Sequence, residues 1–189
     1  MKIAYGNSRM EKRWKNREIS WEEFCKKVSS PAVTTETVEE YKKMGKKQQD
    51  DVKDVGGYVG GHLRGARRKS GTVLCRSMLT LDMDHGTEGI AEELEMLFGF
   101  KMCIYSTHKH EPRLRIIIPL SREISEEEYP AVARMVAKEI GIDMFDDTTY
   151  QPHRLMYWPS VSMNGEFVFK ELEGNILNPD DYLAMYDDW

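Results

Sequence analysis

Two aspartates one residue apart stand at the end of an apolar run. The stretch 77–85 predicts a buried strand in which Asp82 and Asp84 project from the same face. Carboxylates on such a strand are costly to bury, and two on one face repel each other. A divalent cation with oxygen ligands relieves that repulsion. The alternative is that one aspartate caps the next turn while the other is solvated, so the interpretation depends on their neighbours.

The next predicted strand, residues 101–106, ends in a serine, and a histidine follows two residues later. The chain continues there as Ser106-Thr107-His108, and if the pleat continues, Ser106 and His108 face the same side. A histidine near carboxylates can contact a bound ligand, although a structural role inside the core is the more common one.

Two arginines lie on the strand predicted over residues 113–120. Arg113 and Arg115 alternate with the apolar residues of that strand and therefore share the face opposite to them. A guanidinium fork matches the oxygens of a triphosphate. The simpler interpretation is that both arginines form salt bridges with Glu111 or Glu123.

A basic, glycine-rich segment covers residues 54–71. Six glycines alternate there with Arg64, Arg67, Arg68 and Lys69, and no Walker A pattern is present. Glycines let a backbone approach a ligand closely, and arginines bind phosphates. The segment is either a track for a nucleic-acid backbone or a flexible exposed loop with incidental charge.

The pattern of elements predicts an α+β fold. Helices are expected after Ser20, from Thr34 or Thr35, after Thr87 and from Ser125 to Gly141, and a last one over residues 180–189. Further strands are expected at residues 2–5, at an edge, and at 155–158 and 166–169, the last two joined by a hairpin at Asn164-Gly165.

From residue 73 onward the order is strand, helix, strand, strand, helix, strand, strand. The tight pair 101–106 and 113–119 is a hairpin, so the sheet is mixed or antiparallel: a ferredoxin/RRM-like core. The chain is interpreted as one domain, with N-terminal helices and the glycine-rich loop (1–72), the core (73–175) and a C-terminal helix (176–189). Helices would cover one face of the sheet, and the open face would carry the acids, the histidine and the arginines.

Composition limits the alternatives. The net charge of −5 disfavours a generally basic nucleic-acid binder, so such contacts must come from a local patch. The three cysteines are widely spaced and include no C-x-x-C, which indicates neither a disulfide framework nor a zinc site. No apolar leader or membrane-length run occurs, so we expect a cytoplasmic protein without a membrane partner.

Three motifs in this order resemble those of the archaeo-eukaryotic primase superfamily. They are Asp82-Met83-Asp84, Ser106-Thr107-His108, and Phe145-Asp146 followed by Arg154. The likeness covers about residues 50–160 and is greatest to the primase-polymerase domains at the N-terminus of phage and prophage replication proteins, where a helicase often follows. Many members of the superfamily also carry a zinc site, for which this chain has no ligand set.

The resemblance implies a DNA-templated nucleotidyltransferase. In that family the three acids, here Asp82, Asp84 and Asp146, hold two Mg²⁺ or Mn²⁺ ions about 4 Å apart, and the motif histidine, here His108, contacts the incoming nucleotide. The expected partners are a single-stranded DNA template, a primer, nucleoside triphosphates and a helicase domain or subunit. We expect Ser106, Arg113, Arg115 and Arg154 beside the nucleotide. The third acid is less sharply defined, because Asp143 and Asp147 flank it.

Two other functions remain open at this point. A rolling-circle initiator nuclease has a similar core, but it requires two histidines around an apolar residue and a nucleophilic tyrosine. Here His108-Lys109-His110 has lysine in the middle, and no tyrosine lies on a convincing helix with a partner. A non-catalytic module that binds single-stranded nucleic acid is the second alternative.

Overall fold

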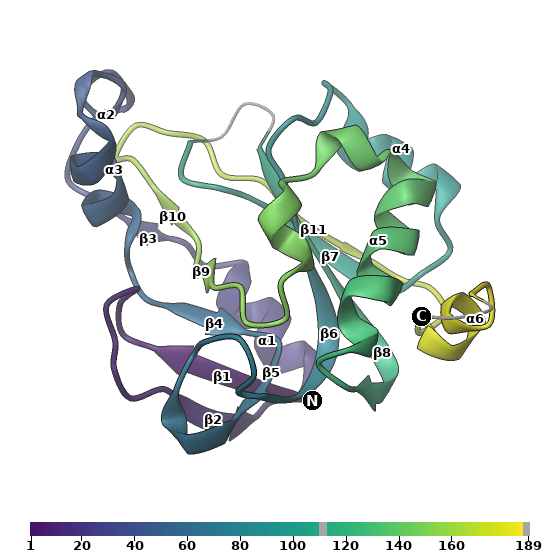
Figure 1. Cartoon of the computed structure of the whole chain (residues 1–189). Coiled ribbons are helices and arrows are strands. Elements are labelled where there is room, and N and C mark those ends of the chain that lie inside the picture. The colour runs from purple at the N-terminus through teal and green to yellow at the C-terminus, as the bar shows by residue number, and fades with distance from the viewer. Residues whose placement is uncertain (110–112, 187–189) are drawn as a thin grey trace.

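A five-stranded antiparallel sheet forms the centre of the protein, as the computed structural model in Figure 1 shows for residues 1–109 and 113–186. The strands lie in the order β11-β7-β8-β6-β5, and every neighbouring pair is antiparallel. Their bounds are β5 (Gly61–Leu63), β6 (Val73–Met83), β7 (Met102–Ser106), β8 (Leu114–Ile124) and β11 (Phe169–Leu172).

The connection of β6, β7 and β8 is that of a split β-α-β unit. Helix α4 (Ile90–Leu97) joins β6 to β7, and both strands pair with β8, which lies between them. Helix α5 (Glu128–Ile140) follows β8 and ends at Gly141, where φ is 142°. The α+β class and the β7–β8 hairpin are therefore confirmed. The outer strands differ from a ferredoxin-like sheet, because β5 lies beside β6 while β11 joins the far edge at β7.

Both faces of this sheet are covered, so the expectation of an open face is wrong over most of its area. Leu79, Leu81 and Met83 pack under α4 and α5. On the opposite face, Met78 and Ile117 pack against helix α1 (Trp21–Val28) and a second, smaller sheet. The physical reason is that the second face carries apolar side chains as well, which must be buried. At the carboxyl end of β6 this second face borders a cleft, which is lined by Asp82 and Asp84.

The second sheet comes mainly from the N-terminal third, which we had interpreted as helical. Its strands lie in the order β2-β1-β4-β9, with β1 (Lys2–Gly6), β2 (Lys15–Glu18), β4 (Gly57–Val59) and β9 (Met156–Tyr157). Strand β1 was expected at an edge, yet it pairs with both β2 and β4. The N-terminal part and the core therefore exchange strands, since β5 completes the central sheet and β9 completes the second one.

The first half of the glycine-rich segment forms two short strands, β4 and β5, rather than a flexible loop. A Cβ at Gly57 would lie 2.7 Å from the carbonyl oxygen of Met156, and one at Gly61 would overlap the backbone of Cys75. These glycines therefore allow neighbouring backbones to approach closely, which is a packing requirement and not a ligand cradle. The basic residues follow in the turn that contains the 3₁₀ helix η1 (Arg64–Ala66).

The N-terminal helices are shorter than expected. Ser20 caps α1 as predicted, accepting a hydrogen bond from the amide of Glu23. The single helix expected from Thr34 or Thr35 is instead a pair, α2 (Val38–Lys43) and α3 (Lys46–Lys53). Helix α2 begins later because Thr37 and Glu40 form its capping box. Before it, β3 (Ala32–Val33) pairs in parallel with β10 (Ser160–Val161).

The C-terminal segments also differ from the prediction. Asn164 and Gly165 lie in a turn but join no hairpin, because β9 pairs with β4, β10 with β3 and β11 with β7. The last helix, α6 (Pro179–Leu183), begins after its cap Asn178 and is shorter than expected. Residues 187–189 lie outside the described residues. No helix in residues 1–109 and 113–186 is long and apolar enough to cross a membrane.

A fully buried arginine holds the two sheets together. The guanidinium of Arg76 donates to the carbonyl oxygens of Gly60 (3.2 Å), Pro152 (2.8 Å) and Met78 (3.1 Å), and it lies 3.8 Å from the ring centre of Tyr129. Burial lowers its pKa. Because Pro152 begins the segment that leads to Arg154, this side chain fixes one wall of the cleft described below.

Replacing Arg76 with methionine should lower the free energy of unfolding by about 3 kcal/mol, because several buried carbonyl groups lose their donors while the volume stays similar. Urea denaturation followed by circular dichroism measures this change. Arg17→Met, which alters an exposed arginine, serves as the control and should change stability by less than about 0.5 kcal/mol. Equal effects of the two substitutions would contradict the role assigned to Arg76.

Candidate active site

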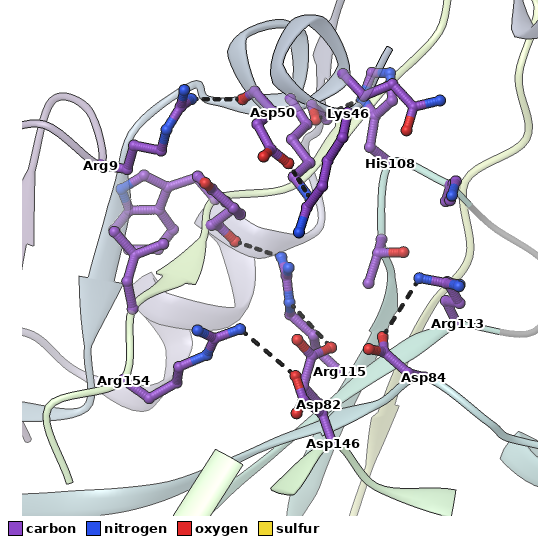
Figure 2. A pocket seen from close by; sticks show the side chains of 18 of the residues that line it. Arg9, Lys46, Asp50, Asp82, Asp84, His108, Arg113, Arg115, Asp146 and Arg154 are labelled. Carbon is purple, nitrogen blue, oxygen red and sulfur yellow. Dashed lines mark hydrogen bonds and ion pairs between the residues drawn. The ribbon is translucent and has the colours of Figure 1, made fainter. Parts of the chain in front are cut away.

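A cleft of about 810 Å³ opens at the carboxyl end of β6. The sheet forms its floor, α2 and α3 form one wall, and the segment from Asp146 to Ser160 forms another. Figure 2 shows Asp82, Asp84 and Asp146 on the floor, with Arg113, Arg115 and Arg154 pointing towards them.

Strand alternation and one backbone hydrogen bond bring the three aspartates together. Asp82 is the penultimate residue of β6 and Asp84 follows the strand, so both project to the cleft side. Asp146 lies between two 3₁₀ turns, η2 (Ile142–Met144) and η3 (Asp147–Tyr150). Its amide donates to the carbonyl oxygen of Asp82 at 3.0 Å, which places it beside the end of β6.

The neighbours of Asp146 point elsewhere. Asp143 and Asp147 are exposed and do not line the cleft, whereas Phe145 before Asp146 is buried. Asp146 also caps η3 by accepting a hydrogen bond from the amide of Thr148 at 3.0 Å. Among these three acids, Asp146 alone is in position to share a ligand with Asp82 and Asp84.

Each of the three aspartates faces one arginine. The closest nitrogen-to-oxygen distance is 3.6 Å for Arg115–Asp82 and 3.6 Å for Arg154–Asp146. For Arg113–Asp84 it is 3.8 Å. These are contacts between charges rather than hydrogen bonds, so a ligand can separate them at modest cost. Asp82 and Arg115 are direct partners across β6 and β8, which explains why they meet.

The charges of Asp82 and Arg115 respond differently to their surroundings. Burial raises the pKa of Asp82; Arg115 opposes this, while Asp84 and Asp146 add to it. Burial by itself lowers the pKa of Arg115, but Asp82 and the Tyr105 hydroxyl outweigh burial and raise it above its ordinary value. The two directions are compatible because Asp82 also faces two other carboxylates. The floor of the cleft is thus a crowded group of three carboxylates, and the single arginine that faces each of them neutralises its charge only partly.

The lining as a whole is basic. Among the residues that the structure describes, eight lysines and arginines and four aspartates line the cleft, in a chain whose net charge is −5. The positive charge is therefore concentrated where the cleft is, which attracts polyanions. The basic residues are Arg9, Lys46, Lys53, Arg68, Lys109, Arg113, Arg115 and Arg154.

His108 lies in the cleft wall but is closely held. Its Nδ1 is 2.7 Å from the Ser160 hydroxyl and its Nε2 is 3.3 Å from a carboxylate oxygen of Glu36. The side chain is only 2 % exposed, and the ring of Tyr41 packs on it at 4.5 Å. Neither ring nitrogen is free to meet a ligand in this arrangement.

Ser106, which was expected beside the nucleotide, and three of the four basic residues of the glycine-rich segment do not line the cleft. The Ser106 hydroxyl accepts a hydrogen bond from the amide of Val168, and because the pleat ends at Ser106 this side chain does not follow His108 into the cleft. Arg64, Arg67 and Lys69 are exposed and are not among the lining residues. Arg68 does line the cleft, with its guanidinium 3.2 Å from the carbonyl oxygen of His153. His110 lies outside the described residues.

The structure adds residues that sequence reasoning missed. Lys46 lines the cleft together with Lys53, which lies 5.4 Å from the ring centre of Tyr157. Arg9 and Ser160 also line it. Nothing in their local sequence marks them, because they reach the cleft through long-range packing of α3 and β10.

The donor set fits a hard divalent cation. Asp82 Oδ1 is a buried carboxylate oxygen without a hydrogen-bond partner, and aspartate oxygens suit Mg²⁺ and Mn²⁺. In the described part of the chain, however, no three acidic, histidine or cysteine side chains converge closely enough to hold an ion. Cation binding therefore requires the aspartates to leave their arginines and converge.

Unpaired polar atoms gather around the same cleft. Half of the buried side-chain atoms that lack a hydrogen-bond partner within residues 1–109 and 113–186 belong to lining residues. Native proteins rarely leave such atoms unpaired, so their concentration here indicates a ligand site. These atoms are Arg68 Nε, Asp82 Oδ1, Thr107 Oγ1, Arg115 Nε and Arg154 Nε.

Comparisons with known proteins agree with the fold. The family model of the VapE N-terminal domain matches residues 1–189. Among solved structures, the chain is similar to the primase-polymerase (PrimPol) AEP domain of cyanophage S-2L, with a TM-score of 0.53 and 14 % identity over 75 % of this chain and 76 % of that chain. No curated protein matches. The resemblance to phage primase-polymerase domains is thereby confirmed for the fold.

Proposed function

The chain belongs to the VapE N-terminal domain family, and from that premise we propose that it is a metal-dependent nucleotidyltransferase that makes or extends a strand on a single-stranded DNA template. The observation that carries the proposal is the floor of the cleft, where three aspartates each face an arginine inside a basic lining. The similar phage domain is a primase-polymerase, which supports the same reaction class.

In this proposal, Asp82, Asp84 and Asp146 would together hold two Mg²⁺ or Mn²⁺ ions. Bound there, such ions lower the pKa of an attacking hydroxyl and neutralise charge on the leaving pyrophosphate. The protein would hold the three carboxylates in place at and beside the end of β6. Asp82 is fixed by the hydrogen bond from its amide to Thr149 (2.9 Å), and Asp146 by its capping contact.

The arginines would position the triphosphate. Once the aspartates bind cations, the guanidinium groups of Arg113, Arg115 and Arg154 are free to pair with phosphate oxygens, for which their forks are suited. Arg115 is oriented in advance because its Nη1 donates to the carbonyl oxygen of Tyr157 at 3.0 Å. This is catalysis by positioning and electrostatics, without a covalent enzyme intermediate.

Primer synthesis and extension with labelled nucleotides on single-stranded DNA test the proposal. We expect products with Mg²⁺ or Mn²⁺ and none in excess chelator. A covalent 5′-phosphotyrosine adduct would instead support the initiator nuclease. Binding of DNA without any incorporation would support the non-catalytic module. A helicase domain or subunit as partner is part of the proposal, since the family resemblance implies replication of a phage or mobile element.

The basic turn after β5 is proposed to guide the template backbone. Arg64 and Arg67 are exposed there, while Arg68 lines the cleft next to them. Replacing all three with alanine should weaken binding of a labelled single strand. It should also reduce the slope of log affinity against log salt by about 0.7 for each lost phosphate contact. Fluorescence anisotropy at several salt concentrations measures both quantities.

Arg134→Ala with Lys138→Ala is the matched control for this turn, because it removes basic charge from exposed positions of α5 outside the cleft lining. That variant should bind DNA with the slope of the wild type. If the triple variant keeps its affinity and slope, the turn does not contact DNA.

A further inference from the structure

His108 is enclosed by a polar cluster that joins three distant parts of the chain. Glu36 precedes α2, while Ser160 and Ser162 are two residues apart around β10 and so lie on one face of the extended chain. The Ser162 hydroxyl donates to Glu36 Oε2 at 2.7 Å, and the same oxygen lies 3.3 Å from His108 Nε2. Ser160 Oγ lies at the other ring nitrogen.

Glu36 is an unusual residue to bury. Its side chain is 6 % exposed, and Oε1 has no hydrogen-bond partner among residues 1–109 and 113–186. Burial by itself raises its pKa, but the hydrogen bonds that it accepts, including the one from Ser162, lower the pKa below its ordinary value. Helix capping does not explain the burial, because Thr37 and Glu40 already form the capping box of α2.

The hydrogen-bond partners determine the tautomer of the histidine. A carboxylate only accepts hydrogen bonds, and the Ser162 hydroxyl, which also lies 3.3 Å from Nε2, already donates to Glu36; Nε2 of His108 therefore carries the proton that faces this pair. Burial lowers the pKa of His108 against the opposing effect of Glu36, which favours the neutral ring, and in a neutral ring with its proton on Nε2 the Nδ1 atom accepts the hydroxyl proton of Ser160. The cleft lining includes His108 and Ser160 but neither Glu36 nor Ser162, so the Nδ1 edge is the one nearest the cleft.

We propose that Glu36 is a positioning residue that fixes the ring orientation and the Nε2–H tautomer of His108, and that His108 and Ser160 together form the wall against which the nucleotide binds. The arrangement is that of a ring held from behind by a carboxylate, which sets the state of its front nitrogen. The inference rests on the proposed function for its consequence, because the nucleotide is the ligand of the cleft. The tautomer itself is independent of any ligand.

Nitrogen-15 NMR of the whole protein labelled at histidine tests the first half of the proposal without nucleotide. A His108→Gln variant identifies the signals of this ring by their loss. In the wild type we expect the pyrrole-type signal at Nε2 and the pyridine-type signal at Nδ1. In Glu36→Ala both should move towards averaged positions, because the ring loses its fixed acceptor. Glu36→Gln, whose amide oxygen can still accept, should restore them.

Nucleotide binding tests the second half. With Mn²⁺ and a labelled deoxynucleoside triphosphate, Glu36→Ala should weaken affinity about tenfold, and Glu36→Gln should recover most of it. Ser160→Ala should also weaken affinity while leaving the Nε2 signal in place. Glu39→Ala is the control, because Glu39 is an exposed acid three residues away that contacts Asn164 and not His108.

Unchanged His108 signals in Glu36→Ala would overturn the proposal. So would unchanged nucleotide affinity in a protein whose signals have moved. If the wild type binds no nucleotide, the proposed function fails, and the NMR result still decides whether Glu36 sets the tautomer. Should Glu36→Ala not fold, as judged by circular dichroism, Glu36→Asp gives the same readout, because it keeps the charge but withdraws the carboxylate from the ring.

Discussion

Asp82→Asn combined with Asp84→Asn is expected to reduce nucleotide incorporation by about a thousandfold or more, while binding of single-stranded DNA persists. Asparagine keeps the shape of each side chain but removes the anionic oxygens that a divalent cation requires. Asp82 is the penultimate residue of β6 and Asp84 follows the strand, whose register with β8 depends on backbone hydrogen bonds, so the fold should survive. Primer extension measures incorporation, and anisotropy with a labelled oligonucleotide measures binding.

The matched control for this pair is Asp143→Asn with Asp147→Asn. It removes the same charge from two exposed aspartates near the cleft that are not among its lining residues. This variant should incorporate nucleotides at the rate of the wild type. Incorporation that survives the Asp82/Asp84 substitution, or that proceeds in excess chelator, would refute the metal-dependent mechanism.

Asp146→Ala is expected to abolish incorporation, whereas Asp147→Ala should have little effect. The two residues are adjacent, but only Asp146 lines the cleft and lies within 3.6 Å of Arg154, while Asp147 is exposed. Asp146→Ala should also cost about 1 kcal/mol of stability, because the hydrogen bond to the amide of Thr148 is lost with the cap.

Asp146→Asn separates these two effects. Asparagine is as good a helix cap as aspartate, so thermal unfolding should match the wild type while incorporation remains absent. An active Asp146→Asn enzyme would show that this carboxylate does not bind the cation. Loss of activity in Asp147→Ala, with Asp146→Ala active, would move the third ligand to the next residue.

The arginines of the cleft floor would have two roles. Without ligand they partly neutralise the aspartates, and with cation and nucleotide they would pair with phosphates. A single set of side chains would thus compensate the carboxylates in the empty site and bind the substrate in the filled one. The long distances of 3.6–3.8 Å between the partners are consistent with such an exchange, since few hydrogen bonds have to be broken.

Local sequence patterns predicted the strand that carries the site. Alternation with a period of two places Asp82 and Asp84 on one face whatever surrounds them, and the apolar positions of β6 and β8 identify the central strands. The hairpin of β7 and β8 follows from their short separation in sequence. Helix starts at Ser20 and the end of α5 at Gly141 were likewise predictable, because capping depends on a few neighbouring residues.

The glycine-rich segment shows where local patterns mislead. Glycine permits both a flexible loop and a close approach of two backbones, and composition does not distinguish the two. Here Gly57 lies close to Met156 and Gly61 lies close to Cys75, so these glycines belong to strands and not to a flexible loop. Those partners lie up to a hundred residues away in the sequence, so the requirement becomes visible only when the chain is folded.

The sequence by itself thus determined that Asp82 and Asp84 share one face at the end of β6, and it determined the α+β class and the order of the central elements. These features depend on short-range periodicity. Only the tertiary structure decided which arginine faces which acid and that His108 is held by Glu36. Each of those contacts joins residues from separate strands, turns or loops. Their physical cause is packing between distant segments, which no local pattern records.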